Sequence, residues 1–82
     1  MKEGELDVVA RADRTLVICE VKTRSSERYG TGFEAVTWSK QSQIRRVTLH
    51  YLQDLRGWHP AEIRFDVASV TPSTIEVIEA AF

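Results

Sequence analysis

Four charged residues interrupt two otherwise apolar stretches near the start of the chain. Glu5 and Asp7 stand at the first stretch, and Glu20 and Lys22 stand at the end of the second. Burying a charged side chain is costly unless it is paired or bound to a metal ion, so these positions need a chemical reason. Two carboxylates beside a lysine are residue types that hold a divalent cation and promote hydrolysis by a metal-activated water.

The two stretches predict neighbouring strands. Residues 6–10 and 16–21 are rich in β-branched side chains and are separated by a short polar turn. Both stretches are apolar on both faces, which is typical of interior strands in a covered sheet.

The length of the turn decides whether the charged groups meet. A two-residue turn at 13–14 places Asp7 opposite Glu20 and Glu5 opposite Lys22. The two carboxylates then lie roughly 5 Å apart at Cβ and repel each other unless a cation lies between them. A slip of one residue would separate them onto opposite faces. The register therefore predicts a site for Mg²⁺ or Mn²⁺, and the structural alternative is a set of cross-strand ion pairs at a strand end.

The rest of the chain predicts one helix and two further strands. Apolar residues recur at spacings of three and four over 39–56, with Thr37 or Ser39 placed to cap the start of this helix and Gly57 to end it. Strands are expected at 63–70 and 75–78. A strand, helix, strand unit places its two strands parallel, so we expect a mixed α/β sheet with the helix on one face.

Composition limits the possible functions. The 82 residues, 43% hydrophobic and 28% charged, make a single domain, 1–82, with a net charge of −1. This balance excludes a polybasic clamp and a charge-dominated disordered chain. No stretch is long enough to span a membrane, and with Cys19 as the one cysteine we expect a cytoplasmic protein.

Positive charge is concentrated in the middle of the chain. Residues 22–46 contain six basic and two acidic side chains. This segment is a candidate strip for binding phosphates, and the alternative is a solvated helix face beside a polar loop. The candidate phosphate-binding residues are Arg24, Arg28, Lys40, Arg45 and Arg46.

Several motifs carry a family resemblance over nearly the whole chain. Residues 4–7 (GELD) and 20–26 (EVKTRSS) resemble the signature of the YraN-like bacterial family, and the match continues through 28–30, 34–37, 40–41, 64–67 and 80–82. This family is similar to the PD-(D/E)xK nuclease superfamily and, distantly, to archaeal Holliday-junction resolvases. The resemblance implies a restriction-endonuclease-like mixed sheet, built from a β-hairpin, a helix crossover and two further strands, with one main helix.

The resemblance also implies residue roles. It assigns Asp7 and Glu20 as metal ligands and Lys22 as the catalytic lysine, with the backbone carbonyl of Val21 completing the metal shell and Glu5 as a further candidate ligand. In addition, Lys40 and Gln41 match positions at the start of the helix that contact DNA or steady the site.

Two departures from the family affect the prediction. Relatives carry a first helix and strand ahead of Gly4, so we expect an N-terminally truncated chain whose activity is open. The strand at residues 6–11 would then have a bare apolar edge, and we expect a homodimer through that edge or through the docking face of the missing helix. Trp38-Ser39 also replaces the usual Pro-Arg.

Three functions remain open from the sequence. The first is a Mg²⁺-dependent DNA endonuclease that acts on duplex or branched DNA. The second is a non-catalytic nucleic-acid-binding module of the same fold, and the third is a protein-interaction domain.

Overall fold

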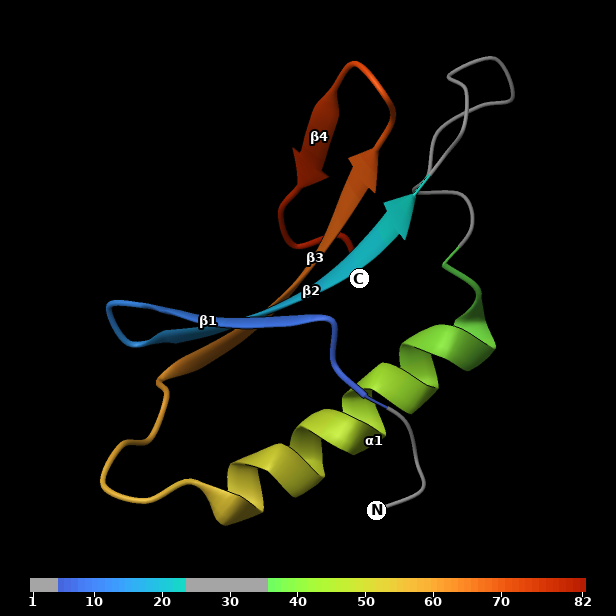
Figure 1. The fold of residues 1–82 in the computed structure, drawn as a ribbon. Helices are drawn as coiled ribbons and strands as arrows, with labels where there is room; N and C mark the ends of the chain where they lie inside the picture. The colour runs from blue at the N-terminus through green and yellow to red at the C-terminus, as the bar shows by residue number, and fades with distance from the viewer. Residues whose placement is uncertain (1–4, 24–35) are drawn as a thin grey trace.

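A computed structural model describes residues 5–23 and 36–82 of the chain and contains four strands and one helix. The strands form one sheet in the order β1-β2-β3-β4, in which β2 and β3 are parallel and the two outer pairs are antiparallel. The predicted mixed α/β fold is confirmed. The elements are β1 (Val8–Ala12), β2 (Thr15–Thr23), α1 (Trp38–Asp54), β3 (Glu62–Val70) and β4 (Ile75–Ile78) (Figure 1).

The first hairpin has the predicted register. Val8 pairs with Cys19, and the strands are joined by a two-residue turn in which Asp13 has a φ of 55°. Aspartate tolerates this left-handed conformation better than most residues, which suits a tight hairpin. Asp7 directly precedes β1, so continuing the register places it opposite Glu20.

Helix α1 begins as predicted and ends earlier than predicted. The Thr37 hydroxyl accepts a hydrogen bond from the Lys40 amide at 3.1 Å and caps the first turn, so the choice between two caps falls on Thr37. The prediction that Gly57 ends the helix is wrong. Leu55 already has an extended backbone, and Gly57, with a φ of 76°, makes a turn in the connection that follows.

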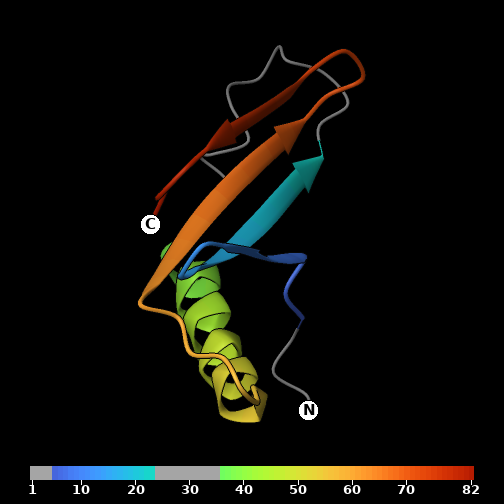
Figure 2. The same cartoon turned by 90° about the vertical axis from the view of Figure 1, so that its left-hand side faces the viewer.

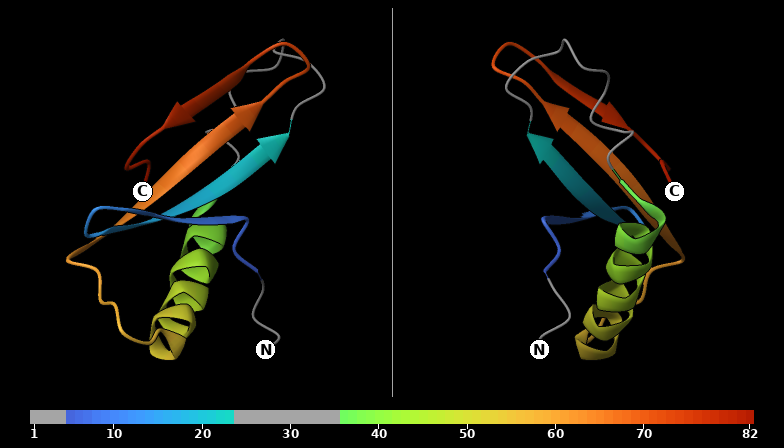
Figure 3. Two further views of the ribbon diagram at one scale, coloured as in Figure 1. Left: turned by 60° about the vertical axis from the view of Figure 1, so that its left-hand side comes forward. Right: turned by 90° about the vertical axis from the view of Figure 1, so that its right-hand side faces the viewer.

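The core lies between α1 and one face of the sheet. Figure 2 and Figure 3 show the helix crossing that face, and in the described part of the chain no helix lies over the opposite face. Because side chains alternate along a strand, residues 16, 18 and 20 of β2 point toward α1. The buried centre and the partly buried residues around it are Leu16, Ile18 and Ile44, packed by Leu6, Val9, Tyr51, Leu52, Trp58, Phe65 and Phe82.

The prediction of two interior strands is correct for β2 and wrong for β1. β2 lies between β1 and β3, whereas β1 is at the edge of the sheet and only Val9 in it is even partly buried. Within residues 5–23 and 36–82, no further strand pairs with the free side of β1. The exposed edge agrees with the edge expected for residues 6–11, and a dimer through it stays a prediction.

The C-terminus folds back onto the sheet. The Ala81 amide donates to the Phe65 carbonyl at 2.7 Å, and the Phe82 ring stacks on Phe65 with the centroids 5.2 Å apart. The Arg45 guanidinium, from α1, lies over both rings at 5.2 and 5.4 Å. The closing residues of the chain therefore extend the core beside the middle of the helix.

Candidate metal centre

The two carboxylates predicted to share a site lie together at the junction of β1, β2 and α1. Asp7 Oδ2 accepts a hydrogen bond from the Val21 amide at 2.9 Å, which fixes the aspartate against β2. Glu20 is 6% exposed and lies on the face of β2 that α1 covers. The hairpin register thus brings both acidic groups to one side of the sheet, at the end of β1 where strand pairing stops.

The pKa values of the two acids are shifted in opposite directions, in part because the acids affect each other. A hydrogen bond with Glu20 is the main reason that the pKa of Asp7 is lowered, and the Val21 amide lowers it further. Burial is the main reason that the pKa of Glu20 is raised, and the hydrogen bond and negative charge of Asp7 add to the effect. The pair therefore holds negative charge that a nearby cation would stabilise.

Lys22 and the Val21 carbonyl lie beside this pair. Lys22 is two residues beyond Glu20 on the same face of β2, and its positive charge lowers the pKa of both carboxyl groups. The N–H and C=O groups of one strand residue point to the same side. Since the Val21 amide donates to Asp7, the Val21 carbonyl also points toward the β1 side of β2, next to the aspartate.

Lys40 supplies a positive charge from the helix. Its Nζ lies 3.5 Å from Glu20 Oε2, and its side chain is 38% exposed. Lys40 also lowers the pKa of Asp7 and of Glu20 by its charge. The sequence placed Lys40 near the site, but the direct contact with Glu20 is visible only once the helix is docked on the sheet.

The donor set fits a metal site that stays open to solvent. The two carboxylates and a backbone carbonyl are hard oxygen ligands, and Mg²⁺ is commonly held by one or two carboxylates with waters and phosphate oxygens completing its shell. Glu5 lines the same small pocket as Asp7 and Glu20. Within residues 5–23 and 36–82, however, no group of three or more His, Cys, Asp or Glu side chains could hold a metal ion. Glu5 therefore does not form a three-carboxylate group with Asp7 and Glu20, and a metal ion here would draw on these two carboxylates.

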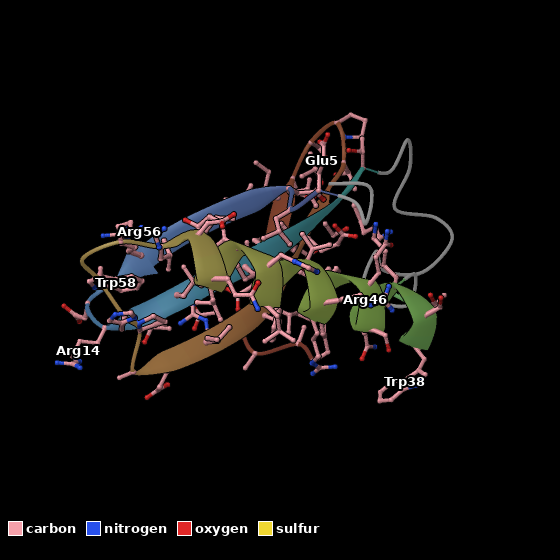
Figure 4. The ribbon with its side chains drawn as sticks, turned by 90° about the horizontal axis from the view of Figure 1, so that it is seen from below. Glu5, Arg14, Trp38, Arg46, Arg56 and Trp58 are labelled. Atoms are coloured by element: carbon pink, nitrogen blue, oxygen red, sulfur yellow. The ribbon has the colours of Figure 1, made fainter. Side chains whose placement is uncertain are left out.

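The predicted nucleic-acid contacts have different surroundings. Arg24 and Arg28 lie outside the described residues. The Gln41 side-chain amide donates to the Val36 carbonyl at 3.2 Å and so steadies the start of α1. Arg45 is occupied by the aromatic stack of the C-terminus. Arg46 is exposed and lies at the midpoint of the helix (Figure 4).

A second buried carboxylate was not singled out from the sequence. Asp66, on β3, accepts hydrogen bonds from Arg64 Nε and a terminal guanidinium nitrogen at 2.9 and 3.0 Å, and a third from the Ala80 amide at 3.0 Å. Asp66 aligns with Cys19 of β2, so it points to the face opposite Glu20. The alternation Arg-x-Asp in a strand was the available signal, because it places an opposite charge on the same face.

Known relatives match the chain over most of its length. The model of the family described as "Uncharacterised protein family UPF0102" matches residues 1–70. The chain belongs to this family. A UPF0102 protein of Kineococcus radiotolerans is 45% identical over 80 residues, which cover 92% of this chain and 66% of the relative. A UPF0102 protein of Parafrankia sp. is 51% identical over 69 residues, which cover 84% of this chain and 58% of the relative.

This UPF0102 chain is shorter than the relatives that it matches. It spans about two thirds of the Kineococcus protein and less of the Parafrankia protein. A UPF0102 protein of Thermodesulfovibrio yellowstonii is 37% identical over 79 residues and is covered to 69% of its length. The predicted YraN-like membership is confirmed by these matches. No helix in the described part of the chain has the length and apolar character needed to cross a membrane.

Proposed function

We propose that this UPF0102 chain carries the metal-binding centre of a DNA endonuclease that hydrolyses phosphodiester bonds with Mg²⁺ or Mn²⁺. The observation that supports it best is the pairing of Asp7 with Glu20 at a sheet edge, with Lys22 on the same face. Purely structural carboxylates would be expected to have complete hydrogen-bond partners. The resemblance of residues 4–7 and 20–26 to the signature of the YraN-like family, which is similar to the PD-(D/E)xK nuclease superfamily, supports the reaction class.

The roles of the residues follow from their surroundings. Asp7 and Glu20 hold the cation, and the Val21 amide keeps Asp7 in the orientation needed to do so. When bound there, Mg²⁺ would supply Lewis-acid activation of the scissile phosphate and of the attacking water. Lys22 lies beside the two carboxylates and contributes a positive charge that orients the attacking water or stabilises charge on the phosphate.

The reaction is a hydrolysis. A water oxygen attacks phosphorus, a new P–O bond forms, and the bond to the leaving sugar oxygen breaks as that oxygen takes up a proton. Flanking phosphates are bound by basic side chains of α1, namely Lys40 in its first turn and the exposed Arg46 at its midpoint. These contacts position the nucleic acid without reading its sequence.

The test is cleavage of labelled duplex DNA and of a four-way junction with Mg²⁺ or Mn²⁺. The variants are Asp7→Asn and Lys22→Ala. Glu62→Gln is the matched control, because Glu62 is an exposed carboxylate at the opposite end of the sheet, paired with Thr15. We expect metal-dependent cleavage by the wild type and by the control, and a loss of at least about 100-fold in each site variant.

Other results would decide against the proposal. Cleavage that survives Lys22→Ala and Asp7→Asn would mean that a different site or a contaminating nuclease is responsible. DNA binding without cleavage under any metal condition would identify a non-catalytic binding module. A chain that neither binds nor cleaves DNA would leave a protein-interaction domain.

A further inference from the structure

Lys40 occupies an unusual position for a lysine. It is the third residue of α1, where the unpaired amide groups and the helix dipole make the environment positive. Acidic side chains are favoured in a first helical turn, and this one contains none. A lysine there is disfavoured by the helix itself, so its placement depends on the carboxylate that faces it from β2.

Among the basic side chains of the described residues, Lys40 is the one in ion-pair contact with the facing carboxylate. Glu20 is buried, and Lys40 Nζ lies 3.5 Å from its Oε2, a distance at which charges attract but which is long for a direct hydrogen bond. The Lys40 side chain remains 38% exposed, so its four-carbon stem has room to move into solvent. The ion pair is therefore one that an incoming cation could replace.

One ammonium group compensates only part of the charge of the pair. Asp7 and Glu20 together carry up to two negative charges, the Lys40 ammonium lies 3.5 Å from Glu20 Oε2, and Lys22 adds a second, smaller positive influence on both carboxyl groups. A divalent cation between the two carboxylates would balance the pair more completely than the lysine does. The cation and the Lys40 ammonium would also repel each other at this separation.

We propose that Lys40 is a displaceable internal counter-ion, which pairs with Glu20 until a divalent cation binds and is then released to bind a phosphate of the nucleic acid. The second part of the proposal, in which Lys40 binds a phosphate of the nucleic acid, rests on the proposed function. It makes Lys40 a positioning residue that couples metal binding to DNA binding, because the charge freed by the first event is used in the second.

The first experiment measures Mn²⁺ binding alone by calorimetry, without nucleic acid. Lys40→Met removes the charge and keeps the apolar stem, Lys40→Arg keeps the charge, and Arg56→Met removes the same charge at the far end of the molecule (Figure 4). We expect Lys40→Met to bind Mn²⁺ about tenfold more tightly than the wild type. Lys40→Arg and Arg56→Met should bind it as the wild type does.

The second experiment measures the salt dependence of DNA binding with Ca²⁺, which occupies oxygen sites, and with EDTA. Each phosphate contact adds about 0.9 to the slope of log affinity against log salt. We expect the slope of Lys40→Met to be shallower than that of the wild type by about this amount with Ca²⁺. In EDTA, where Lys40 stays with Glu20, the two slopes should agree.

The outcomes separate this proposal from the nuclease proposal. Equal or weaker Mn²⁺ binding by Lys40→Met, with cleavage intact in the wild type, would overturn only the role of Lys40. Tighter Mn²⁺ binding by Lys40→Met in a protein that cleaves no DNA would overturn only the nuclease activity. An absence of Mn²⁺ binding in every variant would overturn both.

Discussion

Two buried carboxylates on neighbouring strands have opposite surroundings. Asp66, 3% exposed, accepts three hydrogen bonds, two from the Arg64 guanidinium and one from the Ala80 amide. Glu20, 6% exposed on the other face of the sheet, has the Lys40 ammonium at 3.5 Å and a second carboxylate as its neighbour. The negative charge of Asp66 is therefore fully compensated by its partners, and that of Glu20 is not.

The difference agrees with a structural role for Asp66 and with the metal-binding role that we propose for Glu20. Asp66 joins β3 to the C-terminal residues through the Ala80 amide, so its bonds stabilise the fold. Glu20 gains little from its surroundings, because burial and Asp7 both oppose its ionisation. A buried acid with incomplete compensation indicates a place where a ligand supplies the missing charge.

The largest expected effect is on catalysis. Glu20→Gln should lower metal-dependent DNA cleavage by at least about 100-fold, because the amide cannot supply the negative charge that a divalent cation needs. Asp66→Asn should change cleavage by less than about threefold in the fraction that is folded, since Asp66 faces away from the site. The measurement is initial cleavage rates normalised to folded protein. A similar loss in both variants would show that the two acids do not have separate roles.

The free energy of unfolding should depend more on Asp66 than on Glu20, which is the reverse of the order expected for cleavage. Asp66→Ala should lower the free energy of unfolding by about 2 kcal/mol, because it leaves the Ala80 amide and the Arg64 guanidinium without their acceptor. Glu20→Gln should be neutral or stabilising by less than about 1 kcal/mol in EDTA, since it removes a buried charge and its repulsion with Asp7. Urea unfolding followed by circular dichroism measures both. A larger loss of stability for Glu20→Gln than for Asp66→Ala would contradict the comparison.

Substitutions of Arg45 and Arg46, which are neighbours in α1, should have different effects on stability and on DNA binding. Arg45→Ala should lower the free energy of unfolding by about 0.5–1 kcal/mol, since its guanidinium packs over Phe65 and Phe82. Arg46→Ala should leave stability unchanged and weaken DNA binding, with a salt slope shallower by about 0.9. Thermal unfolding and fluorescence anisotropy measure the two effects. An unstable Arg46→Ala variant with normal DNA binding would reverse these assignments.

The smallest effect is a pH dependence of stability in EDTA. The raised pKa of Glu20 means that the folded state binds a proton more tightly than the unfolded state, whose pKa is near 4.5. Stability should therefore fall as pH rises from about 4.5 through the raised pKa. The lowered pKa of Asp7 acts oppositely, so stability should also fall as pH drops below 3.8. Glu20→Gln should lose the first slope, and Glu62→Gln should keep it.

Local patterns predicted much of the fold. The two-residue turn set the register of the hairpin, and that register set which acids share a face. The Thr37 cap and the helical periodicity located α1 to within two residues at each end. The predicted end at Gly57 was wrong because the chain leaves the helix at Leu55, two residues before the glycine with positive φ.

The surroundings of the charges could not be predicted in the same way. Which basic side chain would reach Glu20 could not be predicted, since Lys40 belongs to an element 20 residues away in the chain. Arg45 and Arg46 were indistinguishable as sequence neighbours, and only docking of the helix and return of Phe82 assigned Arg45 to an aromatic stack. The edge position of β1 likewise depends on which strands pair.

The sequence alone determined which two acids share a face of the sheet. Strand alternation and a short turn decide this, because they are local constraints that act between near neighbours. What the tertiary structure decided is how completely each charge is compensated. That depends on distances between separate elements, set by helix packing and sheet order. Electrostatic energy changes steeply over a few ångströms in a partly buried site, so one buried carboxylate is fully compensated at Asp66 and another is incompletely compensated at Glu20.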